Sequence, residues 1–132
     1  MAADRIAPGL DDMEAIATRA FAELPAEMRQ LCAGLEIFIT DFADPETLAA
    51  VGLDDPFDLT GVYIGVDLSR KTVADPTPAP DRIVLFRRPI LDEWVAHGAI
   101  TLDELVTHVL VHEIGHHFGL SDEDMHRIEA MD

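Results

Sequence analysis

Cysteine is almost absent from this sequence, because Cys32 is the only one in 132 residues. A lone cysteine can form neither an internal disulfide nor a cluster of thiolate ligands for zinc. Any metal site in this chain must therefore be built from histidine and carboxylate side chains. We expect Cys32 to pack as a small hydrophobic side chain rather than to act as a nucleophile.

Basic residues are also scarce, since 9 lysines and arginines stand against 26 acids and give a formal net charge of -17. This charge repels phosphate groups, so we expect no nucleic-acid partner and no binding to an anionic membrane. The acids are spread along the chain, which indicates a solvated surface. An alternative interpretation is an electric field that attracts cations and basic peptides.

Long hydrophobic runs are missing as well. No apolar stretch approaches the roughly 20 residues that a transmembrane helix needs. Residues 1–17 have neither the basic start nor the apolar segment of a secretory signal, so we expect a cytoplasmic protein. The length of 132 residues and a hydrophobic content of 48% predict a single globular domain over residues 1–132.

The hydrophobic pattern predicts helices on both sides of three strands. The expected helical stretches are residues 10–31 with a break at Pro25, a short helix or turn at 45–51, two turns at 91–97 and a long helix over about 102–118. The expected strands are residues 35–41, 59–68 and 81–89. This order predicts an α+β fold in which helices pack against one small mixed sheet.

The long helix has recognisable signals at its ends. Thr101 and Glu104 have the spacing of a capping box, and Gly119 is the residue type that ends helices. Ser121 is expected to cap a last short helix.

The stretch HVLVHEIGHHFGLSDED, residues 108–124, carries the chemistry. His112 and His116 are four positions apart, so a helix brings both imidazoles to one face, where they can bind one cation. Neutral imidazole is a preferred ligand of zinc. Glu113, on the flank of that face, can reach a metal-activated water as a general base. H-E-x-x-H on a helix is the zinc-protease signature for these reasons.

A tetrahedral zinc site needs a third protein ligand, and Asp122 is the first candidate. Gly119 can turn the chain sharply, so that Asp122 swings back toward the metal. Its alternative role is an acid in the first turn of the last helix. Glu129 is the next candidate, and Ser121, Glu123 and Asp124 compete for the same place.

The other histidines near the motif have weaker ligand spacing. His108 lies eight positions before His116, about 12 Å along a helix, so the three cannot bind one ion together. We expect His108 either to contact the metal ligands without binding the metal itself or to lie at the surface. We expect His117 to be exposed or hydrogen-bonded to a backbone carbonyl.

The string HExxHxxGxxD, together with AFAELPAEMR, LEIFITD, LTGVYIGVDL and DRIVLFRRPI, resembles the small bacterial zincin-like metallopeptidase family with a minimal matrix-metalloprotease-like domain. The resemblance implies a zincin-type core and a Zn²⁺ ion on the HExxH helix. Carried over by position, it implies His112 and His116 as ligands, Glu113 as catalytic base and Asp122 as third ligand. Metzincins also place a methionine turn well after the third ligand, and with ten residues after Asp122 we expect no such turn.

The sequence therefore predicts a zinc-dependent metallopeptidase that hydrolyses peptide bonds through a metal-activated water. The alternative is a non-catalytic metal-binding or regulatory module on the same fold. A peptide or protein substrate could add as a strand to an exposed sheet edge, formed by residues 59–68 or 81–87. Candidates to stabilise the oxyanion that forms on the attacked carbonyl are Tyr63, Arg87 and Arg88. Their alternative roles are those of an ordinary strand aromatic for Tyr63 and ordinary surface charges for the two arginines. Substrate preference, native metal and oligomeric state stay open.

Overall fold

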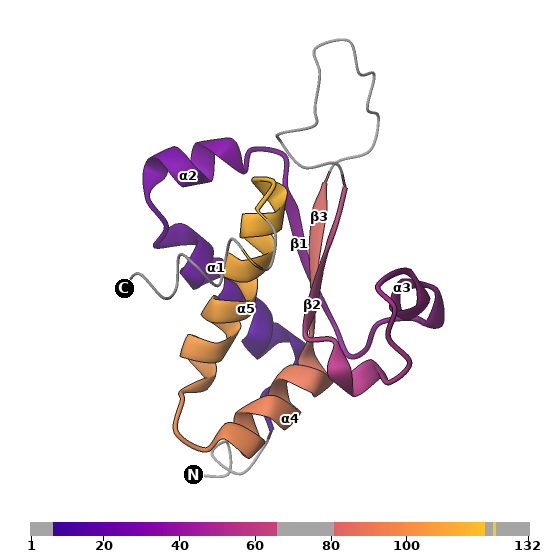
Figure 1. Cartoon of the computed structure of the whole chain (residues 1–132). Helices are drawn as coiled ribbons and strands as arrows, with labels where there is room; N and C mark the ends of the chain where they lie inside the picture. The colour runs from indigo at the N-terminus through magenta and orange to yellow at the C-terminus, as the bar shows by residue number, and fades with distance from the viewer. Residues whose placement is uncertain (1–6, 66–80, 121–122, 124–132) are drawn as a thin grey trace.

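The computed structural model describes residues 7–65, 81–120 and 123, and within them it contains one three-stranded mixed sheet (Figure 1). The strands are β1 (Glu36–Thr40), β2 (Gly61–Ile64) and β3 (Arg82–Phe86), in the order β1-β3-β2. β1 runs parallel to β3, whereas β2 runs antiparallel to it. The expected α+β class with a small mixed sheet is confirmed, and residues 82–86 form the central strand rather than an edge.

Helical elements surround this sheet in the described part of the chain. They are α1 (Leu10–Ala22), α2 (Ala26–Leu31), α3 (Pro45–Ala50), the 3-10 turn η2 (Pro56–Asp58), α4 (Arg87–His97) and α5 (Leu102–His117). The expected break before α2 is confirmed, because Pro25 has an extended backbone and stands at its N-cap. The expected cap at Ser121 falls outside the described residues.

The boundary between β3 and α4 differs from the sequence prediction. The strand was expected to continue to residue 89, but it ends at Phe86 and the helix begins at Arg87. Pro89 lies in the first turn of α4, where the backbone N–H that proline lacks has no partner within the helix. The proline therefore starts a helix here instead of ending a strand, and α4 is 11 residues long. Its end at Gly98, with φ of 73°, is as expected.

The main core lies between one face of the sheet and the pair α1 and α5, which lie on the same side of it (Figure 1). Ile83 and Leu85 of β3 point into this core, together with Met13 of α1 and Leu110 of α5, and all four are fully buried. Cys32 belongs to the same core with 3% exposure, which confirms its expected packing role. Helix α5 thus packs against both the sheet and α1.

A smaller apolar cluster occupies the opposite face of the sheet, on the side of α3 (Figure 1). Its buried members are Ala43, Leu48, Val62 and Phe86. Along β2, Val62 therefore points to α3 while its neighbours Gly61 and Tyr63 point to α5. Within the described part of the chain, no helix is long and apolar enough to cross a bilayer.

Candidate metal centre

The helix that carries the histidines is fixed at its start by a capping box. The Thr101 hydroxyl accepts a hydrogen bond from the Glu104 backbone N–H at 3.0 Å. The Glu104 carboxylate accepts in return from the Thr101 N–H at 3.3 Å. Both contacts satisfy N–H groups that the first turn of a helix would leave without a partner. The predicted capping box is confirmed, and α5 begins at Leu102.

The end of α5 is equally well defined. Gly119 has a left-handed φ of 89°, and its N–H donates to the His116 carbonyl at 2.9 Å. The N–H of Leu120 donates to the Gly115 carbonyl, also at 2.9 Å. These two bonds are the pair of a Schellman motif, which closes a helix and turns the chain back along it. Gly119 ends the helix as the sequence predicted.

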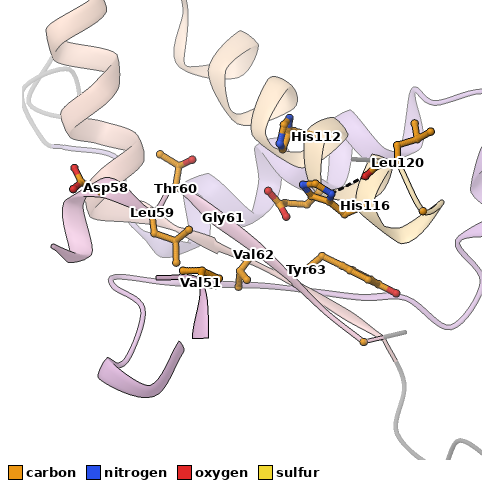
Figure 2. Close-up of a pocket in the computed structure, with 13 residues that line it drawn as sticks. Val51, Asp58, Leu59, Thr60, Gly61, Val62, Tyr63, His112, His116 and Leu120 are labelled. Atoms are coloured by element: carbon orange, nitrogen blue, oxygen red, sulfur yellow. Dashed lines mark hydrogen bonds between the residues drawn. The ribbon is translucent and has the colours of Figure 1, made fainter. Parts of the chain in front are cut away.

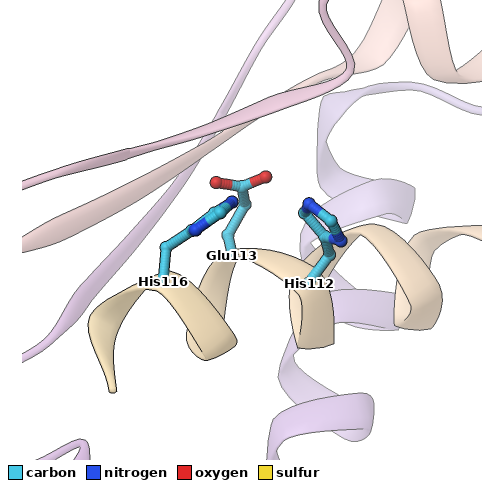
Figure 3. Close-up of side chains that lie close together, drawn as sticks. All are labelled: His112, Glu113 and His116. Carbon is cyan, nitrogen blue, oxygen red and sulfur yellow. The ribbon is translucent and has the colours of Figure 1, made fainter. Parts of the chain in front are cut away.

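His112 and His116 lie one turn apart on α5, and their rings face each other edge to face. The ring centroids are 4.9 Å apart and the ring planes cross at 83°. A carboxylate oxygen of Glu113 lies close by, so that one ligand-type atom from each of the three residues falls within 4.8 Å of the others. Figure 3 shows the Glu113 carboxylate between the two imidazoles. Within residues 7–65, 81–120 and 123, this is the one group of three such side chains.

The His116 ring is oriented by the backbone just beyond the helix. Its Nδ1 atom lies 2.9 Å from the Leu120 carbonyl oxygen (dashed line in Figure 2). A carbonyl oxygen only accepts hydrogen bonds, so Nδ1 carries a proton, and in the neutral ring Nε2 is then the nitrogen with the lone pair. Metal-binding histidines commonly donate their second ring N–H to such a carbonyl, which fixes both tautomer and orientation. The donor set therefore fits zinc, for which neutral imidazole is a preferred ligand.

Glu113 is buried with 7% exposure, in a row of side chains different from that of the histidines. Val109, Glu113 and His117 follow each other at intervals of four and face β2, whereas His108, His112 and His116 form the adjacent, more exposed row. The close approach of α5 to β2 depends on Gly61. A Cβ at that position would lie 2.9 Å from Val109 Cγ1 and 3.4 Å from Glu113 Cγ. Gly61 thus lets β2 lie close to this face of α5.

A cleft of about 630 Å³ is lined by side chains of α5 and by the edge strand β2 with the residues before it (Figure 2). Its helical wall carries His112, Glu113 and His116, and its strand wall includes residues 59–63 and Gly65. β2 pairs with β3 on one side, so its other side is an edge of the sheet next to this cleft. Of the two strands considered from the sequence, residues 61–64 form this edge.

Of the three candidates to stabilise the oxyanion, one lines the cleft and two do not. Tyr63 lines the cleft. Arg87 does not, because its guanidinium bonds to Asp41 at 2.8 Å and to the Pro8 carbonyl at 2.6 Å. Arg88 lies over the Phe42 ring, 5.8 Å from the centroid. The ordinary structural role weighed for the two arginines is the one they have.

His117 is buried with 2% exposure, and of the two alternatives expected for it the bond to a backbone carbonyl is the one present. Its Nε2 donates to the Leu31 carbonyl at 3.1 Å, and its Nδ1 lies 3.2 Å from the Tyr63 hydroxyl. The Asp81 carboxylate is 3.4 Å from Nδ1 and only 5% exposed. The sequence indicated none of these partners, although the interval of four from Glu113 places His117 on the face toward β2.

The remaining candidates divide between the surface and the part of the chain that is not described. His108 is exposed, with its ring centroid 6.5 Å from that of His112, in line with the prediction for it. His97 is exposed at the end of α4. Asp122 and Glu129, the candidates for the third ligand, lie outside the described residues, as does Asp124. The third ligand stays a prediction.

A known protein family matches most of this chain. The model of a family described as zincin-like metallopeptidase matches residues 32–131, which include β1, the cleft and the whole of α5. No curated protein matches the chain. The matched stretch covers most of the 132 residues and contains His112, Glu113 and His116.

Proposed function

The chain belongs to the zincin-like metallopeptidase family, and from that premise we propose that it is a zinc-dependent peptidase whose general base is Glu113. One observation carries the proposal. Two imidazoles and a carboxylate come within 4.8 Å of one another, and they do so in the wall of a cleft beside a sheet edge. A metal-binding group, a base and room for an extended peptide are thereby combined in one place.

His112 and His116 would hold the metal through their ring nitrogens, with Asp122 as the proposed third ligand. His116 is the better defined of the two, because its bond to the Leu120 carbonyl leaves Nε2 as the nitrogen that can bind a metal. When bound, zinc would supply Lewis acidity, which polarises the scissile carbonyl and lowers the pKa of a coordinated water. Two histidines and a carboxylate also suit other divalent ions, so the experiment below measures several metals.

Glu113 would accept a proton from the attacking water and pass it to the leaving amine. The carboxylate is well placed for this task because it lies beside the imidazoles while its Cγ packs near Gly61. Packing of its stem limits the side chain to few rotamers, and a general base must first be held within hydrogen-bond reach of the proton it takes. Burial at 7% exposure also keeps bulk water from competing for the carboxylate.

The substrate would be a peptide that lies extended in the cleft and adds to β2 as a further strand. Strand addition uses the backbone groups of an exposed edge for affinity and so tolerates many side chains. Among the described residues, those that line the cleft include Asp58 and Glu113 but no lysine or arginine. Neutral or basic peptides therefore suit this cleft better than acidic ones.

The test compares wild type with Glu113→Gln, which keeps the shape of the side chain and removes its basicity. Each purified protein is analysed for bound metals and then incubated with a peptide library whose products are identified by mass spectrometry. We expect equal zinc content in both proteins and cleavage by the wild type alone, with a loss of at least about 100-fold in the variant. Zinc in both proteins without cleavage in either would favour the non-catalytic metal-binding module instead.

A further inference from the structure

His117, which directly follows His116, has an unusual environment for a residue next to a proposed metal ligand. Its ring is 2% exposed and bonds to the Leu31 carbonyl at the end of α2 and to the Tyr63 hydroxyl on β2. Asp81, immediately before β3, is the third neighbour at 3.4 Å. One side chain thus joins the last turn of α5 to three segments that are far apart in the sequence.

The atoms of this ring have distinct roles. The Leu31 carbonyl can only accept, so Nε2 carries the proton and donates to it over 3.1 Å. In the neutral ring, Nδ1 is then the acceptor for the Tyr63 hydroxyl, 3.2 Å away. Within the described part of the chain, no buried polar side-chain atom lacks a hydrogen-bond partner. The ring is therefore held at both nitrogens, in one orientation.

Stability alone does not account for a polar cluster at this position. Hydrogen bonds that replace bonds to water contribute little net free energy, and apolar side chains of equal volume often stabilise a core as well. Apolar contacts, however, let a helix rotate or slide by small amounts, whereas directional bonds at two ring nitrogens do not. The cluster thus supplies orientation, which a row of leucines would not supply.

What it orients is the metal-binding turn. His117 directly follows His116 and lies one turn beyond Glu113 in the row that faces β2. Gly61 lets the Val109 and Glu113 part of that row approach β2 closely, and Tyr63, two residues along the same strand, meets His117. Tyr63 also lines the cleft. The distance between β2, beside which the substrate would lie, and the proposed metal-binding side chains of α5 is thereby set at two points on β2.

We propose that His117 is a positioning residue: through Tyr63 and the Leu31 carbonyl it fixes the rotation of the last turn of α5, and so the place of the His116 and Glu113 side chains in the cleft. The proposal rests on the proposed function, in that it assigns a purpose to a residue beside the proposed metal site. It gives His117 no contact with metal or substrate.

The test measures zinc affinity and site geometry separately from folding. Tyr63→Phe removes the hydroxyl and keeps the ring, His117→Gln keeps an amide that can donate to the Leu31 carbonyl, and His117→Ala removes both bonds. His97→Asn serves as the control, because His97 is exposed on α4 and remote in sequence from the motif. For each protein, zinc affinity is measured by chelator competition, the Co²⁺ absorption spectrum reports ligand geometry, and circular dichroism follows thermal unfolding of the metal-free chain.

We expect zinc affinity to fall about 3- to 10-fold in Tyr63→Phe and about 10- to 100-fold in His117→Ala, with partial recovery in His117→Gln. The Co²⁺ spectrum should change in the same order, at temperatures where every protein is folded. If His117→Ala does not fold, the zinc affinity and Co²⁺ spectrum of Tyr63→Phe still test the inference. Lower melting temperatures with unchanged zinc affinity and spectrum would reduce the cluster to a structural role and overturn the inference alone. A wild-type chain that binds no metal would overturn the proposed function as well.

Discussion

The Nδ1 atom of His116 lies 2.9 Å from the carbonyl oxygen of Leu120, four residues further along the chain. The contact exists because the helix ends between them, at His117 with Phe118 as its C-cap, and the chain turns back at Gly119. The way this helix ends therefore decides which nitrogen of the His116 ring faces the Leu120 carbonyl and which faces away from it. Helix termination and the orientation of this ring are coupled at one glycine.

Replacing that glycine should weaken metal binding. Gly119 has φ of 89°, a conformation that costs a residue with a Cβ about 1–2 kcal/mol. In Gly119→Ala, the turn should open, the Leu120 carbonyl should move away, and His116 should lose the partner that fixes its tautomer. We expect zinc affinity to fall about 10-fold or more, measured by chelator competition on the folded protein.

Gly98→Ala is the matched control for this change. Gly98 also ends a helix with a left-handed φ of 73°, and a Cβ there would meet no atom within 4 Å. The variant should lose a similar free energy of unfolding and keep its zinc affinity. Equal zinc affinity in the two variants would show that the turn after His116 does not orient the ring.

Two members of the histidine row should respond differently to removal. His112→Ala deletes one of the proposed ligands, and a two-ligand site holds zinc poorly, so metal analysis should find little zinc. His108→Ala removes the same side chain one turn earlier on α5, where the ring is exposed and its centroid is 6.5 Å from that of His112. This variant should keep its zinc, and a loss there would place His108 among the ligands.

Helix α5 could be predicted closely because its signals are local. The capping box lies within four residues, the histidines lie within one turn, and Gly119 follows directly, so the sequence alone placed the helix within a residue of its observed bounds. The start of α4 was missed for a local reason too, because residues 87–89 were assigned to the end of a strand, whereas Pro89 stands in the first turn of a helix.

The rest of the site depends on contacts that no short stretch of sequence contains. Strand order decides whether β2 or β3 is the edge, and order follows from packing of the whole sheet. His117 meets Tyr63 across 54 positions and Leu31 across 86. The apolar pattern did not show that His117 would be buried, and it could not show which polar partners the ring would find.

The lone cysteine gives a prediction for the pH dependence of stability. Burial raises the pKa of the Cys32 thiol above its ordinary value, because the thiolate would lose its hydration. The unfolded chain then releases the thiol proton at a lower pH than the folded chain. The protonated thiol therefore favours the folded state. This contribution to the free energy of unfolding is fully present below the thiol pKa of the unfolded chain, about 8.5, and is lost as the pH rises through the thiol pKa of the folded chain.

The measurement compares wild type with Cys32→Ala by urea unfolding between about pH 7 and pH 10. The free energy of unfolding of the wild type should fall more steeply with rising pH than that of the variant. Reaction of the folded wild type with a thiol reagent should also be slow, since only 3% of Cys32 is exposed. Parallel pH profiles in the two proteins would mean that the thiol does not titrate differently on folding.

Gly61 offers the sharpest test of how closely the cleft's two walls must pack. In Gly61→Ala the new Cβ would lie 2.9 Å from Val109 Cγ1 and 3.2 Å from Leu85 Cδ2. Val109 is β-branched and sits on a helix, so it has essentially one χ1 rotamer and cannot turn away. We expect a loss of about 1–3 kcal/mol in the free energy of unfolding, and a fall in peptidase activity as α5 moves from β2.

A second substitution, Val109→Ala, shows whether that loss comes from this one contact. It removes the methyl group that the new Cβ meets, at the cost of a small cavity of its own. In the double variant the Cβ added at position 61 would occupy that cavity, so the two losses should not add, and the coupling should be about 0.5–3 kcal/mol. Urea unfolding of the wild type, both single variants and the double variant measures this cycle. Strictly additive losses would show that the Cβ added at position 61 does not clash with Val109. Glycine at position 61 would then be required for a different cause.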